Sequence, residues 1–240
     1  MDKNDTFQRI SFGDVSCNEI RFFGRRKGKA IKGSKQKLLD ELLPKLTVRL
    51  PKKGDMLDLN TLFGIKPEKV YLEVGFGGGE HLAALSEKYA GIGFIGAEPF
   101  MNGVASLLAH LNGSHEHETV NSALAPGRVD NVRIWPDDVR EIFPYLKDKC
   151  FDRTYVLYPD PWPKARHEAR RFINLANLRH LHRLLKTGGQ IYVATDVAAY
   201  AEWAAGEVAA SGLFEQVNKD VRTPPKDWVS TRYEKKGIKA

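Results

Sequence analysis

The chain has 240 residues, of which 42% are hydrophobic and 28% are charged, and this composition excludes global disorder and a fibrous architecture. Its length suffices for one α/β domain with modest extensions, but not for two full-sized domains. No apolar run approaches the roughly 20 residues that span a bilayer. The N-terminus lacks the apolar core of a secretory signal, so we expect a cytoplasmic protein with no membrane partner. Cys17 and Cys150 lie far apart, which argues against a disulfide framework or a zinc knuckle.

Basic residues outnumber acidic ones by 37 to 30, and they are concentrated in two stretches. Residues 21–37 contain eight basic side chains and no acidic one, with Phe22 and Phe23 among them. Residues 164–186 contain seven basic side chains and one acid, Glu168. Stretches this one-sided favour a phosphate-binding surface, although a merely solvated basic face explains them about as well.

The N-terminal quarter of the chain differs in pattern from the rest. Residues up to about Lys35 are polar and without apolar period, which predicts a mobile basic arm, and a function for this arm would require it to order on RNA. Leucines at helical spacing between Lys35 and Leu46 predict an outer helix, and residues 51–64 are expected to form a loop. We therefore assign residues 1–60 to a basic arm with an outer helix and residues 61–240 to the main domain.

After Pro67, short β-rich runs alternate with helical stretches, as in a parallel, doubly wound sheet covered on both faces. The predicted strands are Val70–Val74, Ile92–Glu98, Val132–Trp135, Phe151–Leu157, Gln190–Thr195 and Phe214–Val217. The predicted helices are Glu80–Tyr89, Gly103–Leu111, Asp138–Leu146, Glu168–Leu185 and Ala198–Ser211. Residues 112–128 look like an irregular loop of unusual length. In such Rossmann-like sheets, ligands bind beyond the carboxyl ends of the strands.

The strongest local signal is the glycine-rich run from Glu73 to Gly79, directly after a strand and before a helix. Glycines such as Gly75 and Gly77 let the backbone approach a ligand closely. A dinucleotide fingerprint would need a further glycine where Glu80 stands, and acids at this position repel a pyrophosphate. S-adenosylmethionine has no phosphate and carries a sulfonium cation, so acids at this position are compatible with it as the cofactor. A glycine-rich turn without any ligand is the alternative.

Two further acids follow predicted strands. Glu98 ends the second strand, where a carboxylate can hydrogen-bond both hydroxyls of a ribose; the alternative is an acidic strand cap. Asp138 follows the third strand, where an adenine amino group would lie. Capping of a helix N-terminus explains Asp138 equally well.

The fourth strand leads into a proline-rich segment, Tyr158-Pro-Asp-Pro-Trp-Pro-Lys164. Prolines fix φ and remove backbone donors, so this loop should be stiff. A stiff loop would hold Asp160 against a reacting centre and present Trp162 as an aromatic surface for a base or cofactor. A proline-rich turn without function is possible but fits this particular sequence less well.

Other kinds of site find less support. His115 and His117 could offer metal ligands, but two histidines in a polar loop usually have no metal-binding role. We therefore predict no metal site. Neither a Walker loop nor a Gly-x-Ser-x-Gly nucleophile elbow occurs.

In combination, these features resemble the bacterial tRNA (guanine-N7)-methyltransferases. The resemblance rests on the glycine-rich run, on Glu98, on the segment from Pro159 to His167, on Ala194-Thr195-Asp196 and on Thr231-Arg232-Tyr233-Glu234. It spans residues 20–238 and implies a class I methyltransferase domain whose parallel sheet has an antiparallel C-terminal edge. It also implies tRNA as the partner, with methyl transfer from S-adenosylmethionine to N7 of a variable-loop guanosine. We expect a monomer or homodimer that requires no protein partner.

The resemblance also implies roles for individual residues. Those that would line the cofactor site are Glu73, Glu98, Asp138 and Asp160, the last being also the catalytic residue. Those that would contact the substrate guanosine are Lys164, Asp196, Thr231, Arg232, Tyr233 and Glu234. Those that would contact RNA are Arg166, His167, Arg170 and Arg171.

The chain departs from the family pattern at two places. Residues 112–128 form a longer loop than expected, and Pro163 stands where a polar residue such as histidine is more usual. Two alternatives remain open: a methyltransferase of another RNA or of a small substrate, and a Rossmann-like RNA-binding protein without catalysis. A measurement of cofactor binding would distinguish the RNA-binding protein without catalysis from the methyltransferases.

Overall fold

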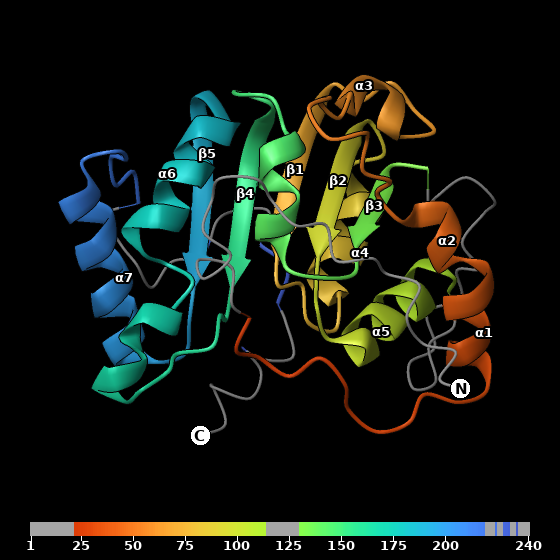
Figure 1. The fold of residues 1–240 in the computed structure, drawn as a ribbon, viewed down its shortest axis with the longest axis horizontal. Coiled ribbons are helices and arrows are strands. Elements are labelled where there is room, and N and C mark those ends of the chain that lie inside the picture. Colours follow the sequence, from red (N-terminus) through yellow and green to blue (C-terminus); the bar gives the residue numbers. More distant parts are fainter. Residues whose placement is uncertain (1–21, 114–129, 219–223, 225–227, 231–233, 235–240) are drawn as a thin grey trace.

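The computed structural model describes residues 22–113, 130–218, 224, 228–230 and 234 (Figure 1). Its described strands form one parallel sheet in the order β3-β2-β1-β4-β5. The strands are β1 (Lys69–Val74), β2 (Ile92–Ala97), β3 (Val132–Trp135), β4 (Phe151–Leu157) and β5 (Leu185–Ala194). The order changes direction between β1 and β4, so a crevice is expected beyond the carboxyl ends of these two strands.

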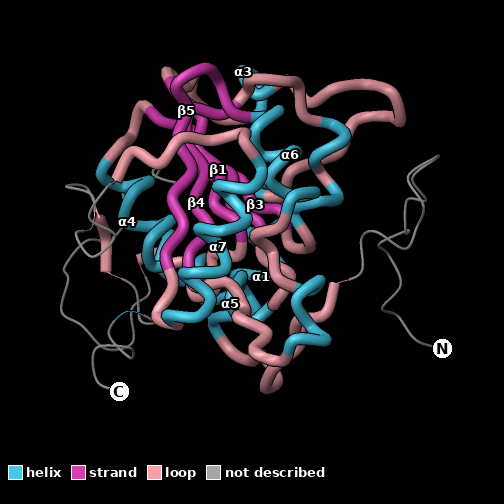
Figure 2. Tube along the Cα trace, turned by 90° about the vertical axis from the view of Figure 1, so that its left-hand side faces the viewer, coloured by secondary structure: helices cyan, strands magenta, loops and turns pink. Residues whose placement is uncertain are grey.

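Helices cover both faces of the sheet (Figure 2). The α-helices are α1 (Ser34–Glu41), α2 (Leu43–Leu46), α3 (Leu59–Leu62), α4 (Glu80–Lys88), α5 (Met101–Leu111), α6 (Leu175–Leu184) and α7 (Ala198–Ser211). Short 3₁₀-helices are η1 (Val139–Glu141), η2 (Phe143–Tyr145) and η3 (Ala165–Arg170). These elements confirm the Rossmann-like, doubly wound parallel sheet that the alternating pattern predicts.

The two faces of β1 explain its nearly continuous apolar sequence. Leu72 and Val74 point into a core shared with η1, η2, α6 and α7. Tyr71 points into a second core, shared with α4 and α5. Successive side chains of a strand alternate between faces, and both faces are buried here, so no polar alternation remains for the sequence to display. The strand predictions from Val70 to Thr195 are confirmed to within a few residues at their ends.

Three predicted helices are broken in the structure. The helix expected from Lys35 to Leu46 divides at Leu42, because Pro44 lacks an amide N–H and its ring cannot follow a preceding helical turn. The helix expected from Asp138 to Leu146 becomes η1 and η2, with Pro144 in the first turn of the second. Both predicted helices were too long, because the helical spacing of the apolar residues was followed across a proline in each.

The third break lies in the helix predicted from Glu168 to Leu185. Here η3 ends at Arg170, and α6 starts anew at Leu175. The Asn174 side chain caps α6 by accepting a hydrogen bond from the Asn177 N–H at 3.0 Å. The break turns the chain beneath the proline-rich loop.

The predicted C-terminal strand Phe214–Val217 is wrong, since these residues are not in a strand. Every strand pair in the described part of the chain is parallel, so the antiparallel edge stays a prediction. Most of the predicted long loop, from residue 114 onward, lies outside the described residues. The division of the chain at residue 60 also stays a prediction.

Residues 22–33 belong to the predicted mobile N-terminal arm, and in the structure they contact the domain. This segment runs past the lower ends of the strands in Figure 1 and has defined backbone contacts without RNA. The N–H of Met101, at the start of α5, donates to the carbonyl of Arg26 at 3.1 Å. The arm is thereby held against the edge of the sheet where ligands are expected.

Candidate active site

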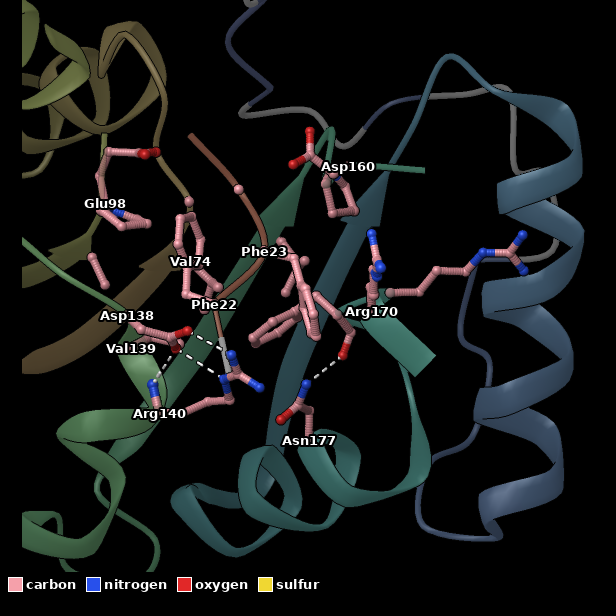
Figure 3. A pocket seen from close by; sticks show the side chains of 18 of the residues that line it. Phe22, Phe23, Val74, Glu98, Asp138, Val139, Arg140, Asp160, Arg170 and Asn177 are labelled. Carbon is pink, nitrogen blue, oxygen red and sulfur yellow. Dashed lines mark hydrogen bonds and ion pairs between the residues drawn. The ribbon is translucent and has the colours of Figure 1, made fainter. Parts of the chain in front are cut away.

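A cavity of about 430 Å³ opens at the carboxyl ends of β1, β2 and β4 (Figure 3). Its volume falls in the range of small-molecule sites. The loops after these strands, the start of η1 and the N-terminal arm all contribute to its lining. Glu98 and Asp138 lie on one side of it and Asp160 on the other. The structure thus brings together three of the four predicted cofactor carboxylates, together with Gly75 and Gly77.

The turn after β1 requires glycine. Gly75 and Gly77 have φ values of 67° and 56°, in the left-handed region that side chains disfavour. A Cβ at Gly75 would meet no heavy atom within 4 Å, so the backbone borders open space at this point. Both glycines line the cavity. The backbone can therefore contact a ligand directly, as the sequence predicted.

Glu98 is buried and held in place by the backbone. One carboxylate oxygen accepts from the Gly77 N–H at 2.7 Å and the other from the Phe100 N–H at 2.9 Å. Burial raises the pKa of Glu98 to about 7; these two amides oppose the rise, while the carboxylates of Asp160 and Glu73 add to it. Hydroxyl donors from a ligand would favour the ionised form. Glu98 is thus held in position by the backbone, and a ligand that donates hydrogen bonds to it would favour its ionised form.

Glu73 is placed differently from the prediction. Its side chain is only 3% exposed and lies 2.7 Å from Nδ1 of His81, in the first turns of α4. Glu73 follows Leu72 on the strand and therefore points away from the face of Val74, which does line the cavity. Glu73 is not among the lining residues. It joins β1 to α4 beneath the glycine turn, and its contact with the cofactor stays a prediction.

Asp138 lines the cavity but already has partners. Its carboxylate forms an ion pair with Arg140 at 2.6 Å and accepts from the Arg140 backbone N–H at 3.0 Å. The capping role that sequence left open is therefore present, at the start of η1. A contact with an adenine amino group would have to share these oxygens and stays a prediction.

The proline-rich loop carries backbone strain at the cavity. Tyr158 and Trp162 have φ values of 51° and 42°, which are unfavourable for non-glycine residues. Asp160 lies between them, exposed, and lines the cavity. The prolines alone do not fix this conformation, because each strained residue directly precedes a proline, which favours an extended backbone at that position and not a positive φ.

Arg171 holds the loop from below. It is only 8% exposed, and its guanidinium donates to the carbonyls of Pro161 at 3.0 Å and Trp162 at 3.2 Å. The same group lies 4.5 Å from the ring centre of Trp203 on α7. Its donors are directed to the loop carbonyls inside the protein, and the contact of Arg171 with RNA stays a prediction. Arg171 positions the segment that carries Asp160.

Arg170 faces the other way, into the mouth of the cavity. Its guanidinium lies 4.6 Å from the ring centre of Phe23 and 5.0 Å from that of Trp162. The ring of His167 meets the ring of Trp162 edge-on, with 5.7 Å between the ring centres. Arg166 is exposed. Partial desolvation and then the neighbouring cations lower the pKa of His167. These three residues remain candidates for RNA contact.

The comparisons with known proteins agree with this geometry. Residues 67–240 match a family model described as "Putative methyltransferase". Three relatives carry the name tRNA (guanine-N(7)-)-methyltransferase. The one from Paramagnetospirillum magneticum is 44% identical over 94% of this chain and 91% of its own length. Those from Rhodospirillum rubrum and Ruegeria pomeroyi are both 43% identical, over 92% and 91% of this chain and 84% and 89% of their own lengths. The chain belongs to this methyltransferase family.

Among the remaining predicted residues that the structure describes, Lys164, Asp196 and Glu234 do not line the cavity of the methyltransferase. Lys164 and Asp196 are exposed, after β4 and β5 respectively, at the same edge of the sheet. Glu234 accepts a hydrogen bond from the indole N–H of Trp228 at 3.1 Å. The predicted substrate residues outside the described part of the chain are Thr231, Arg232 and Tyr233, as are the histidines of the rejected metal site, His115 and His117.

Sequence reasoning missed the contribution of the arm to the methyltransferase cavity. Phe22, Phe23 and Arg25 line it although they lie far from every strand in sequence. Two adjacent phenylalanines inside a basic stretch were the available signal. They were read as part of a surface, because nothing local indicates that the arm returns to the sheet.

The residues of the methyltransferase cavity fit S-adenosylmethionine. Glu98 offers carboxylate oxygens suited to a diol, and Asp160 offers a charge suited to a cation. Glu80 stands in the first turn of α4, where it would oppose a phosphate.

The helices of the described part of the chain include none with the length and apolar character of a membrane span.

Proposed function

We propose that the protein transfers the methyl group of S-adenosylmethionine to N7 of a guanosine in tRNA. The observation that carries this proposal is one cavity in which the glycine turn, Glu98 and Asp160 meet beneath a strained aromatic loop. The relatives that cover nearly the whole chain bear the corresponding name. The finer parts of the proposal are a variable-loop target, a cytoplasmic location, and action as a monomer or homodimer without a protein partner.

Each side chain has a distinct task in this proposal. The sulfonium of the bound cofactor supplies an electrophilic methyl group. Glu98 accepts hydrogen bonds from the ribose hydroxyls and so orients the cofactor. Asp160 stands at the cavity mouth, where its charge stabilises positive charge that moves from sulfonium to purine during transfer. Asp160 is the catalytic residue of the proposal.

The protein has little proton chemistry to perform. N7 of neutral guanine carries a lone pair and no proton, so no side chain needs to remove one before attack. The rate enhancement then depends on alignment of the two reactants and on preorganised carboxylates. Arg171 contributes to alignment by holding the carbonyls on both sides of the strained residue Trp162.

The surface beside the cavity suits a polyanion. Lys164 and Arg166 are exposed next to the loop that carries Asp160, and Arg170 lies at the cavity mouth. N7 lies on the major-groove edge, which is inaccessible in an A-form helix, so the target guanosine must be unpaired or drawn out of its stack. Trp162 offers an aromatic face to such a base. Asp196, Thr231, Arg232, Tyr233 and Glu234 are proposed to complete the guanosine site.

The test is methyl transfer to a tRNA transcript. The transcript is incubated with the protein and methyl-labelled cofactor, and the product is then treated with borohydride and aniline, which cleave RNA at N7-methylguanosine. The proposal expects label in tRNA and cleavage at a variable-loop position. Label without such cleavage would indicate methylation of another atom, and cofactor binding without any transfer would indicate another RNA or a different class of substrate.

A further inference from the structure

Residues 22–29, which we call the strap, cross the cavity at its open side. The strap has no regular secondary structure. Its lining residues are Phe22, Phe23, Gly24 and Arg25. In Figure 3, Phe22 and Phe23 lie between the side of the cavity that carries Glu98 and the side that carries Arg170. The strap therefore forms a wall of the cavity although it belongs to neither the sheet nor its connections.

Asn102 at the start of α5 anchors the strap through both ends of its side-chain amide. Its Oδ1 accepts from the Gly28 N–H at 2.8 Å, and its Nδ2 donates to the Lys29 carbonyl at 2.8 Å. The backbone N–H of Met101 adds a hydrogen bond to the Arg26 carbonyl at 3.1 Å. One asparagine thus satisfies two consecutive residues of an extended segment. This is a specific backbone contact, independent of the side chains that the strap carries.

The strap also fits its anchor sterically. A Cβ at Gly28 would lie 2.8 Å from Oδ1 of Asn102 and 2.8 Å from Cζ of Phe100. Real Cβ contacts are not this short, so a larger residue requires the strap, the Asn102 amide or the Phe100 ring to shift. Phe100 in turn donates its N–H to Glu98. The strap is therefore seated against the same turn that fixes the predicted ribose acceptor.

The opposite side of the cavity holds the other end of the strap. Phe23 stacks on the guanidinium of Arg170 at 4.6 Å and meets Trp162 edge-on at 6.4 Å. Near the middle of the strap, Arg26 forms an ion pair with Asp137 at 2.7 Å. The strap thus connects the loop after β2 to the proline-rich loop after β4, across the space between them.

We propose that the strap is a wall of the cofactor site and that Asn102 is the residue that positions it. A cofactor that contacts Phe22 or Phe23 binds the docked strap and not the displaced one. By linkage, strap docking and cofactor binding then stabilise each other by the same factor. This inference rests on the proposed use of S-adenosylmethionine.

The first test measures affinity for S-adenosylhomocysteine by calorimetry. Asn102→Ala removes two hydrogen bonds from the strap. Each bond stabilises the docked strap by a few-fold in the equilibrium constant, so the substitution should weaken binding of S-adenosylhomocysteine about tenfold. Gly28→Ala keeps the asparagine but adds the crowding Cβ, and should weaken binding in the same direction. Asn60→Ala, which removes a local hydrogen bond on α3 far from the cavity, is the matched control and should bind like the wild type.

The second test uses trypsin, since the strap carries exposed cleavage sites at Arg25, Arg26, Lys27 and Lys29. Saturating S-adenosylhomocysteine should slow cleavage at these sites at least about threefold in the wild type, and less in Asn102→Ala. Unchanged affinity in both strap variants, folded as judged by circular dichroism, would overturn the proposal. So would cleavage that the ligand does not slow. A wild type that binds no S-adenosylhomocysteine would instead refute the cofactor assignment itself.

Discussion

Cofactor affinity should depend on pH through Glu98. The pKa of this residue is raised to about 7 by burial, so at pH 6 only about one tenth of the free protein has Glu98 ionised. Ribose hydroxyls donate to the ionised form, and the apparent dissociation constant rises as the binding-competent fraction falls. Affinity for S-adenosylhomocysteine should therefore be roughly tenfold weaker at pH 6 than at pH 8, where about nine tenths are ionised.

The assay is calorimetry across this pH range in two buffers of different ionisation enthalpy, which counts the protons released on binding. Up to about one proton should be released at pH 6 and nearly none at pH 8. Glu98→Gln should bind more weakly by about 1 to 3 kcal/mol but without this pH dependence. An affinity of the wild type that does not change with pH would contradict the proposed role of Glu98. The same pH dependence of affinity in Glu98→Gln as in the wild type would also contradict it.

The same raised pKa has a defined effect on stability. The folded protein holds the Glu98 proton more tightly than the unfolded chain does, so the contribution is fully present below the ordinary value of 4.5. It is lost as the pH rises to about 7, and the free energy of unfolding of the free protein should fall over this window relative to that of Glu98→Gln. Urea denaturation at pH 5 and pH 8 measures the difference.

Three further predictions concern the loop and the basic surface. Asp160→Asn should lower the single-turnover rate at saturating cofactor by about 100-fold or more; a rate within about threefold of the wild type would make Asp160 structural. Arg171→Lys, which lacks the planar fork of donors that reaches both carbonyls, should lower the same rate while leaving S-adenosylhomocysteine affinity within about threefold, and equal losses in both would contradict a positioning role. Lys164→Ala combined with Arg166→Ala should reduce the slope of log affinity for tRNA against log salt by about 2. An unaltered slope would show that these two cations face away from RNA.

The sequence predicted the sheet well, and it placed Gly75, Gly77 and Glu98 at the same edge of it, because both depend on local patterns. Buried strands such as β4 appear in the sequence as apolar runs, and the turn at Gly75 has a positive φ that favours glycine. The roles of Glu73 and Arg171 could not be read in this way. Each is set by partners that only the fold supplies: His81 across a helix start, and the loop carbonyls together with Trp203.

The arm is the clearest case of missing information. Residues 22–33 have a basic composition typical of a solvated tail, and no period marks them as packed. Their anchors, Asn102 and Asp137, lie more than 70 residues further along the chain. A backbone contact made through an asparagine amide does not depend on the side chains of the bound segment, so it leaves no pattern in that segment's sequence.

The central claim is that guanine N7 is the atom that accepts the methyl group. It is tested most directly by single-turnover transfer to two tRNA transcripts, one with guanosine and one with 7-deazaguanosine at the mapped position. The second transcript carries a C–H where N7 was and keeps the Watson–Crick edge. We predict equal binding of both transcripts, with methyl transfer to the first and none to the second. Transfer to the 7-deaza transcript at a comparable rate would contradict the account.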